Sequence, residues 1–217
     1  STLLKQMINH LIQQNDVQPK NIFFMNLEHP YLVSYSKDVG YLQKMYEEYL
    51  KIADPDGEVY VLFDEVQFFK EWPVFVKAHY EQKKIQFILT GSNSALLSSD
   101  LITLLSGRTL PLEVFPLSFT EIAQAKNIVV DDLLQVMKHR IKLQGLVDQF
   151  LKYGGFPEVI LNFIPTVAYD ILGAYAKTIL YQDVAPRLQI RKSIELERLF
   201  TYLISNIGKP FSYSNLS

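Results

Sequence analysis

The chain has 217 residues, 48% of them hydrophobic, and a formal net charge of -2, which indicates a globular protein and excludes whole-chain electrostatic attraction to nucleic acid or an anionic membrane. Cys is absent, which excludes disulfides and thiolate metal sites and favours a reducing, cytoplasmic location. No apolar run reaches the roughly 20 residues of a membrane span, and we therefore expect no membrane partner.

The first half of the chain alternates helical and strand patterns. Apolar residues at helical spacing predict helices over 2–14, 38–53, 73–83 and 94–106. Short apolar runs predict buried strands over 21–27, 59–63, 85–90 and 109–115. This alternation predicts an α/β fold with a parallel sheet.

From Phe119 onward the pattern is helical. It predicts helices over 119–126, 131–152, 165–182 and 193–206. A break falls at Gly154-Gly155-Phe156-Pro157. We expect three domains, an α/β core at 1–125, a helical domain at 126–192 and a third segment at 193–217.

Two adjacent carboxylates follow the second predicted strand, where 59–63 leads directly into Asp64 and Glu65. Open α/β sheets place ligands at the carboxyl ends of their strands. There Asp64 could hold Mg²⁺, and Glu65 could polarise a water for attack on a γ-phosphate. The alternative is a carboxylate pair that stabilises the start of a turn or helix through its dipole.

Three further segments carry polar residues whose roles stay open. After the strand at 85–90, Thr90, Ser92 or Asn93 could orient the attacking water, or the last two could cap the next helix. Arg108 could meet transition-state charge or complement a helix dipole. The opening Ser-Thr pair is either a helix cap or the residues that follow the Lys of a P-loop, GxxxxGK[ST].

In combination these motifs resemble the AAA+ P-loop ATPases, most nearly a bacterial and archaeal branch related to the STAND and archaeal ATPase groups. The matching residues are Ser1-Thr2-Leu3-Leu4, Asp64-Glu65-Val66-Gln67, Thr90-Gly91-Ser92-Asn93, Leu105-Ser106-Gly107-Arg108, Pro116-Leu117-Ser118-Phe119-Thr120-Glu121 and Tyr153-Gly154-Gly155-Phe156-Pro157-Glu158. They extend along nearly the whole chain, and the last is typical of the C-terminal domain of that branch.

The resemblance implies ATP and Mg²⁺ as cofactors. Ser1 and Asp64 would bind the metal, and Thr2 would lie near the α- and β-phosphates. Glu65 would activate the attacking water.

The resemblance also implies roles for residues outside the carboxylate pair. Asn93, or Ser92 in its place, would be the first sensor of the γ-phosphate. Arg108 would be an arginine finger, which implies a homo-oligomer or another partner. Asn26 would match a position where some AAA+ proteins hold the catalytic Glu inactive, although an Asn there can also simply terminate the strand.

The Gly and Lys residues of the P-loop are absent from the 217 residues. In AAA+ topology the strand before the P-loop lies between the fourth and fifth strands, and we therefore expect it upstream of Ser1. Residues 193–217 resemble the start of a winged helix-turn-helix, for which DNA binding and protein contact are open alternatives. Two functions compete: an ATPase that works as a conformational switch, and a non-catalytic, nucleotide-responsive regulator or scaffold.

Overall fold

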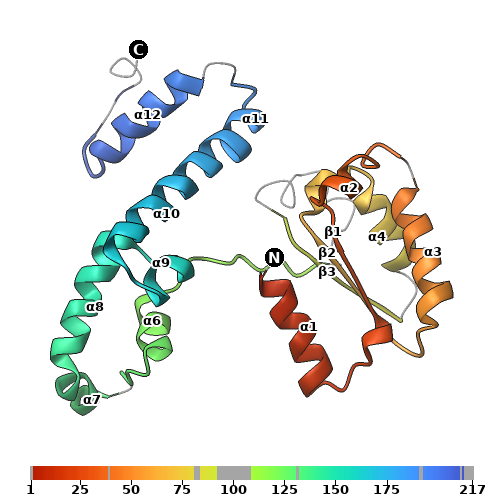
Figure 1. Cartoon of the computed structure of the whole chain (residues 1–217), viewed down its shortest axis with the longest axis horizontal. Helices are drawn as coiled ribbons and strands as arrows, with labels where there is room; N and C mark the ends of the chain where they lie inside the picture. The colour runs from red at the N-terminus through yellow and green to blue at the C-terminus, as the bar shows by residue number, and fades with distance from the viewer. Residues whose placement is uncertain are drawn as a thin grey trace. The chain divides into compact units, whose positions relative to one another are not determined.

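The computed structural model describes residues 2–38, 40–80, 84–91, 109–130, 132–190, 193–210 and 212. The chain forms two compact units, Ser1–Pro111 and Leu112–Ser217 (Figure 1). The division falls before the expected domain change at 125/126, because helix α6 (Phe119–Ala125) buries Ile122 and Ala123 in the core of the second unit.

The first unit contains a sheet of three parallel strands in the order β1-β2-β3. The strands are β1 (Ile22–Asn26), β2 (Val59–Asp64) and β3 (Ile85–Leu89). Asn26 lies opposite Asp64, and Phe63 lies opposite Leu89. The predicted parallel α/β sheet is thus confirmed for these three strands, and their carboxyl ends share one edge.

Helices precede and connect these strands, as the sequence pattern predicts. They are α1 (Thr2–Gln14), η1 (Pro19–Asn21), α2 (Pro30–Val33), α3 (Tyr41–Ala53), η2 (Val66–Phe68) and α4 (Trp72–Tyr80). Figure 1 shows α3 and α4 on one side of the sheet and α1 on the other. The short elements η1, α2 and η2 were not predicted, because a single turn is too short to show a periodicity.

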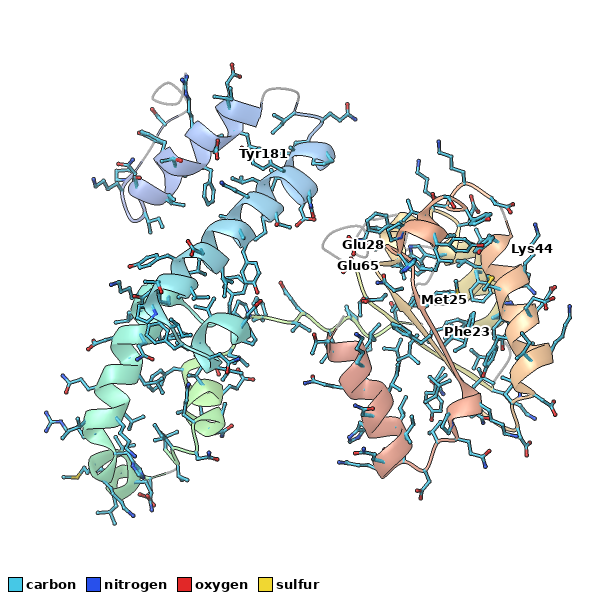
Figure 2. All side chains as sticks on the ribbon, in the orientation of Figure 1. Phe23, Met25, Glu28, Lys44, Glu65 and Tyr181 are labelled. Carbon is cyan, nitrogen blue, oxygen red and sulfur yellow. The ribbon has the colours of Figure 1, made fainter. Side chains whose placement is uncertain are left out.

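Alternate side chains of each strand point to opposite faces of the sheet, and different helices cover the two faces. Phe23 and Met25 are buried on the α3 side of β1, as Figure 2 shows, in one cluster with Phe63 and Tyr46. Along β2, residues of the other parity point to the opposite face. The last residue of β2, Asp64, therefore shares the face on which α1 lies.

The predicted strand over 109–115 is wrong. None of these residues is in a strand, and no described strand pairs with them. Leu110, Leu112 and Val114 alternate along the chain as a strand would, yet they are 85%, 81% and 71% exposed. A β-strand exists only through hydrogen bonds to a neighbour, which the described residues do not supply here. The predicted helix over 94–106 lies outside the described residues.

The second unit is helical, as predicted. Its elements are α6, α7 (Leu133–Lys138), α8 (Arg140–Tyr153), α9 (Pro157–Leu161), α10 (Pro165–Thr178), the π-helical turn η4 (Ile179–Val184), α11 (Ala185–Arg187) and α12 (Ser193–Ser205). The helix predicted over 131–152 is two helices that meet at His139. Among the described residues, no helix has both the length and the apolarity to cross a bilayer.

A close backbone contact joins the segment before α6 to the segment after α8. Helix α8 ends at Tyr153 and is followed by Gly154, whose φ of 74° suits a residue without a Cβ. The next residue, Gly155, accepts a hydrogen bond from the Leu117 N–H at 2.8 Å. A Cβ on Gly155 would overlap the carbonyl oxygen of Leu117, and the contact therefore requires glycine.

Candidate functional site

The carboxylate pair lies at the carboxyl edge of the sheet. Asp64 is the last residue of β2, and its side chain is almost fully buried, with 2% of the residue exposed. Glu65 follows it directly. Figure 2 shows Glu65 and Glu28 at the same end of the sheet, as expected for residues that follow β2 and β1. The predicted position of both carboxylates at the strand ends is therefore what the structure shows.

Asp64 differs from the other buried polar residues of the described chain. These are Asn21 and His79. Asn21 bonds to the backbone of Asp56 and Glu58 near the amino ends of the strands. His79 lies in α4, and its Nε2 is 2.6 Å from Oε1 of Gln43. Those two residues lie away from the carboxyl ends of the strands or in a helix, whereas Asp64 places a buried carboxylate at the edge where parallel α/β sheets bind ligands.

Thr90 connects the carboxylate pair to β3. Its Oγ1 donates to Oδ1 of Asp64 at 2.5 Å and accepts from the N–H of Glu65 at 3.3 Å. Backbone bonds continue the ladder past the strand ends, from Thr90 N–H to Phe63 O at 2.9 Å and from Val66 N–H to Thr90 O at 3.0 Å. The Thr90 hydroxyl is therefore directed at the Asp64 carboxylate.

Glu65 has a left-handed backbone, with φ 57° and ψ 53°. For a residue that is not glycine, this conformation costs about 1 kcal/mol or more and must be held by its surroundings. The Thr90 hydroxyl supplies one bond, to the Glu65 N–H. The turn η2 that follows is anchored by Val66 and Phe69, which are 0% and 2% exposed. The backbone conformation of Glu65, and with it the direction of its side chain, is therefore fixed by the Thr90 bond and by the buried residues of the turn that follows.

Gln67 contacts the Glu65 carboxylate, a relationship that sequence reasoning missed. Its Nε2 donates to Oε2 of Glu65 at 2.6 Å. The signal in the sequence is the position of Gln67 within the Asp-Glu-Val-Gln motif, which by itself indicates no role for this residue. The left-handed turn at Glu65, which brings the two side chains together, has no signature in residue types.

The other predicted residues are placed as follows. Thr2 begins α1 and is exposed. Asn26 accepts a hydrogen bond from the Glu28 N–H on its Oδ1 at 3.1 Å, and its own carbonyl accepts from His29 N–H at 3.1 Å. These bonds close a turn after β1, as expected for the strand-terminating alternative. Ser1, Ser92, Asn93 and Arg108 lie outside the described residues.

The donor set at the edge fits a magnesium ion that is shared with phosphate. Carboxylate oxygens are among the ligands that Mg²⁺ prefers, and Asp64 supplies a carboxylate at this edge. Within the described ranges, no group of three or more His, Cys, Asp or Glu residues could hold a metal ion alone. Mg²⁺ in proteins is commonly held by one or two carboxylates, with water and phosphate oxygens as the remaining ligands.

Comparison with known proteins connects this geometry to a family. A family model described as an AAA domain matches residues 1–123, and a model for a domain of unknown function (DUF8612) matches residues 144–217. No solved structure matches the chain.

Three curated relatives are similar to the chain. An uncharacterised protein of Haemophilus influenzae is 32% identical over 217 residues, which are 100% of this chain and 51% of that protein. The uncharacterised protein MJ1544 of Methanocaldococcus jannaschii is 32% identical over 157 residues, 72% of this chain and 35% of that protein. MJ1637 of the same organism is 24% identical over 243 residues, 100% of this chain and 48% of that protein.

The chain spans about half the length, or less, of the curated relatives it matches. The family model, by contrast, covers more than half of the chain, and the matched residues contain the whole three-stranded sheet and the carboxylate pair. The chain therefore belongs to the AAA domain family, whose members are nucleotide-binding, ATPase-like proteins.

Proposed function

We propose that the protein binds ATP with Mg²⁺ and hydrolyses it, and that hydrolysis serves as a conformational switch. The observation that carries this proposal is the placement of Asp64 and Glu65 at the carboxyl edge of β2, fixed there by Thr90 from β3. Membership of the AAA domain family supports nucleotide binding. The geometry adds two carboxylates in positions suited to two different tasks.

Asp64 is assigned to the metal. Its carboxylate is buried and receives a hydrogen bond from Thr90, which fixes its orientation. A bound Mg²⁺ would neutralise charge on the β- and γ-phosphates. Ser1, predicted from the sequence as a second metal ligand, and Thr2, predicted near the phosphates, complete this part of the proposal.

Glu65 is assigned to the water. It is more accessible than Asp64, and it lies one residue beyond the strand, at the carboxyl edge of the sheet. A carboxylate there can accept a proton from a water that attacks the γ-phosphate. Asn93 or Ser92 would sense that phosphate, and Arg108 would act as an arginine finger from the same or a neighbouring copy. These last roles rest on the sequence resemblance.

The test is ATP turnover by the intact protein. Glu65→Gln is expected to lower phosphate release by about 100-fold or more while ATP binding is retained, because the amide cannot accept the proton. Glu58→Gln is the matched control, since Glu58 is an exposed carboxylate that directly precedes the opposite end of β2. Asp64→Ala is expected to weaken binding of the Mg²⁺–ATP complex.

Two outcomes would overturn the assignment. Equal turnover by wild type and Glu65→Gln would remove Glu65 from the reaction. ATP binding without turnover in wild type would favour the alternative, a nucleotide-responsive regulator or scaffold whose C-terminal residues 193–217 bind DNA or a protein.

A further inference from the structure

Gln67 reaches back to Glu65 from the turn that follows it. Its Nε2 donates to Oε2 of the carboxylate at 2.6 Å. The amide nitrogen must face the carboxylate, because the amide oxygen would be repelled there. Hydrogen bonds to an ionised acceptor are shorter and stronger than those between neutral groups. This contact therefore has the energy to select one orientation of a flexible side chain.

The backbone on both sides of the contact is held in place. Phe68 N–H donates to Glu65 O at 3.2 Å, and Phe69 N–H donates to Val66 O at 3.0 Å. Val66 and Phe69 are anchored in the core of the first unit. The Gln67 amide is thus presented to Glu65 from a rigid turn, which is the arrangement that precise placement of a reacting group requires.

We propose that Gln67 is a positioning residue for Glu65, whose amide holds the carboxylate in the orientation that activates water. The inference rests on the proposed function, in which Glu65 is the general base. A general base must lie within hydrogen-bond reach of the proton that it accepts. Displacement by about 1 Å can cost about 100-fold in rate. Gln67 itself takes no proton and touches no reacting atom in this role.

A positioning role and a purely structural role predict different kinetics. If Gln67 only stabilised the turn, its loss would lower the melting temperature and leave kcat per folded molecule unchanged. If it orients Glu65, its loss lowers kcat while nucleotide binding and KM are maintained, because the ground-state contacts to the nucleotide are untouched.

The experiment replaces Gln67 by Met, an unbranched apolar side chain of similar length, in the intact protein. For Gln67→Met we expect kcat to fall about 10- to 100-fold, with KM and the Kd for Mg²⁺–ADP changed by less than about twofold. Gln67→Glu should fall further, because it sets a second carboxylate against Glu65. Gln86→Met is the matched control, since it breaks a similar amide–carboxylate bond, Gln86 Nε2 to Glu58 Oε1 at 2.8 Å, away from the site.

A second measurement detects the Gln67–Glu65 hydrogen bond without requiring ATP turnover. In ¹⁵N-resolved NMR spectra, the Gln67 side-chain amide should be shifted downfield and slow to exchange in wild type, and both properties should be lost in Glu65→Ala. Unchanged amide signals would overturn the inference. So would a kcat for Gln67→Met within about twofold of wild type, in a protein whose Glu65→Gln variant is inactive, and that result would leave the proposed function standing. Wild-type turnover that persists in Glu65→Gln would reject both.

Discussion

The hydroxyl of Thr90 donates a hydrogen bond to Oδ1 of Asp64 and accepts one from the N–H of Glu65. One side chain at the end of β3 thereby fixes both consecutive residues at the end of β2. The two strands are consequently joined at the edge by side-chain as well as backbone bonds, and the position of each carboxylate depends on the same hydroxyl.

Thr90→Val should therefore destabilise the first unit, although the two side chains have the same shape. The change removes a donor from the buried Asp64 carboxylate, and we expect a loss of about 1–3 kcal/mol in the free energy of unfolding, measured by urea titration. Thr90→Ser, which keeps the hydroxyl, should recover most of it. Equal stability of the Val and wild-type proteins would show that the bond contributes nothing.

Asn21 anchors the start of the sheet. Its Nδ2 donates to the carbonyls of Asp56 at 2.5 Å and Glu58 at 2.9 Å. In Asn21→Asp a buried carboxylate would face these two carbonyl oxygens with no proton to donate. We expect a loss of about 2–4 kcal/mol at neutral pH in urea titration, partly recovered at low pH where the new acid is protonated.

Asn162→Asp, at an exposed position after α9, is the control for Asn21→Asp and should change stability by less than about 0.5 kcal/mol. Similar losses for the two substitutions would contradict the anchoring role of Asn21.

Gly155 tests the packing of the second unit. In Gly155→Ala the new methyl group would overlap the carbonyl oxygen of Leu117, which is backbone and cannot rotate away. We expect a loss of about 3 kcal/mol or more. Gly173→Ala, inside α10 with open space around the added Cβ, should instead stabilise by about 0.5–1 kcal/mol through helix propensity. Thermal unfolding of the two variants would show shifts of opposite sign, and a common sign would contradict the prediction.

Tyr49 makes the free energy of unfolding of the first unit depend on pH in the alkaline range. Burial, with a smaller contribution from nearby Tyr46, raises the pKa of Tyr49 to about 12, and its hydroxyl donates to Lys20 O at 2.6 Å. In an unfolded chain the tyrosine pKa is about 10. The pKa of Tyr49 is higher in the folded than in the unfolded protein. The contribution of Tyr49 to the free energy of unfolding is therefore fully present below about pH 10 and is lost as the pH rises toward 12.

Tyr49→Phe cannot ionise. The difference in unfolding free energy between wild type and Tyr49→Phe should thus be constant from about pH 7 to 9 and should narrow above about pH 10. Urea titrations at a series of pH values would measure it. A difference that stays constant up to about pH 11 would contradict the raised pKa.

The three strands and the position of the carboxylate pair could be predicted from the sequence, because each depends on a local pattern. The run at 59–63 is apolar throughout since β2 is buried on both faces, and Asp64 is conspicuous as the first polar residue after it. The same pattern at 109–115 led to a wrong strand. Periodicity reports which side chains are apolar, whereas a strand also needs a neighbour at hydrogen-bonding distance.

The internal contacts of the site could not be predicted. The Thr90–Asp64 bond joins residues 26 apart in the chain, and its partner choice depends on the register between β2 and β3. The Gln67–Glu65 bond depends on a left-handed residue that is not glycine, which residue types do not reveal. Both hydrogen bonds depend on tertiary structure, which the local sequence motif does not reveal.

The glycine contact in the helical unit has a consequence for how this chain can be divided. Because Leu117 is locked against Gly155, the residues just before α6 are an integral part of the helical unit. A helical fragment that begins at residue 126 would leave behind this lock and the buried Ile122, and would expose the apolar surface that α6 covers. Residues 116–125 must therefore be kept with the helices that follow them, both in an expressed fragment and in a domain exchange between proteins.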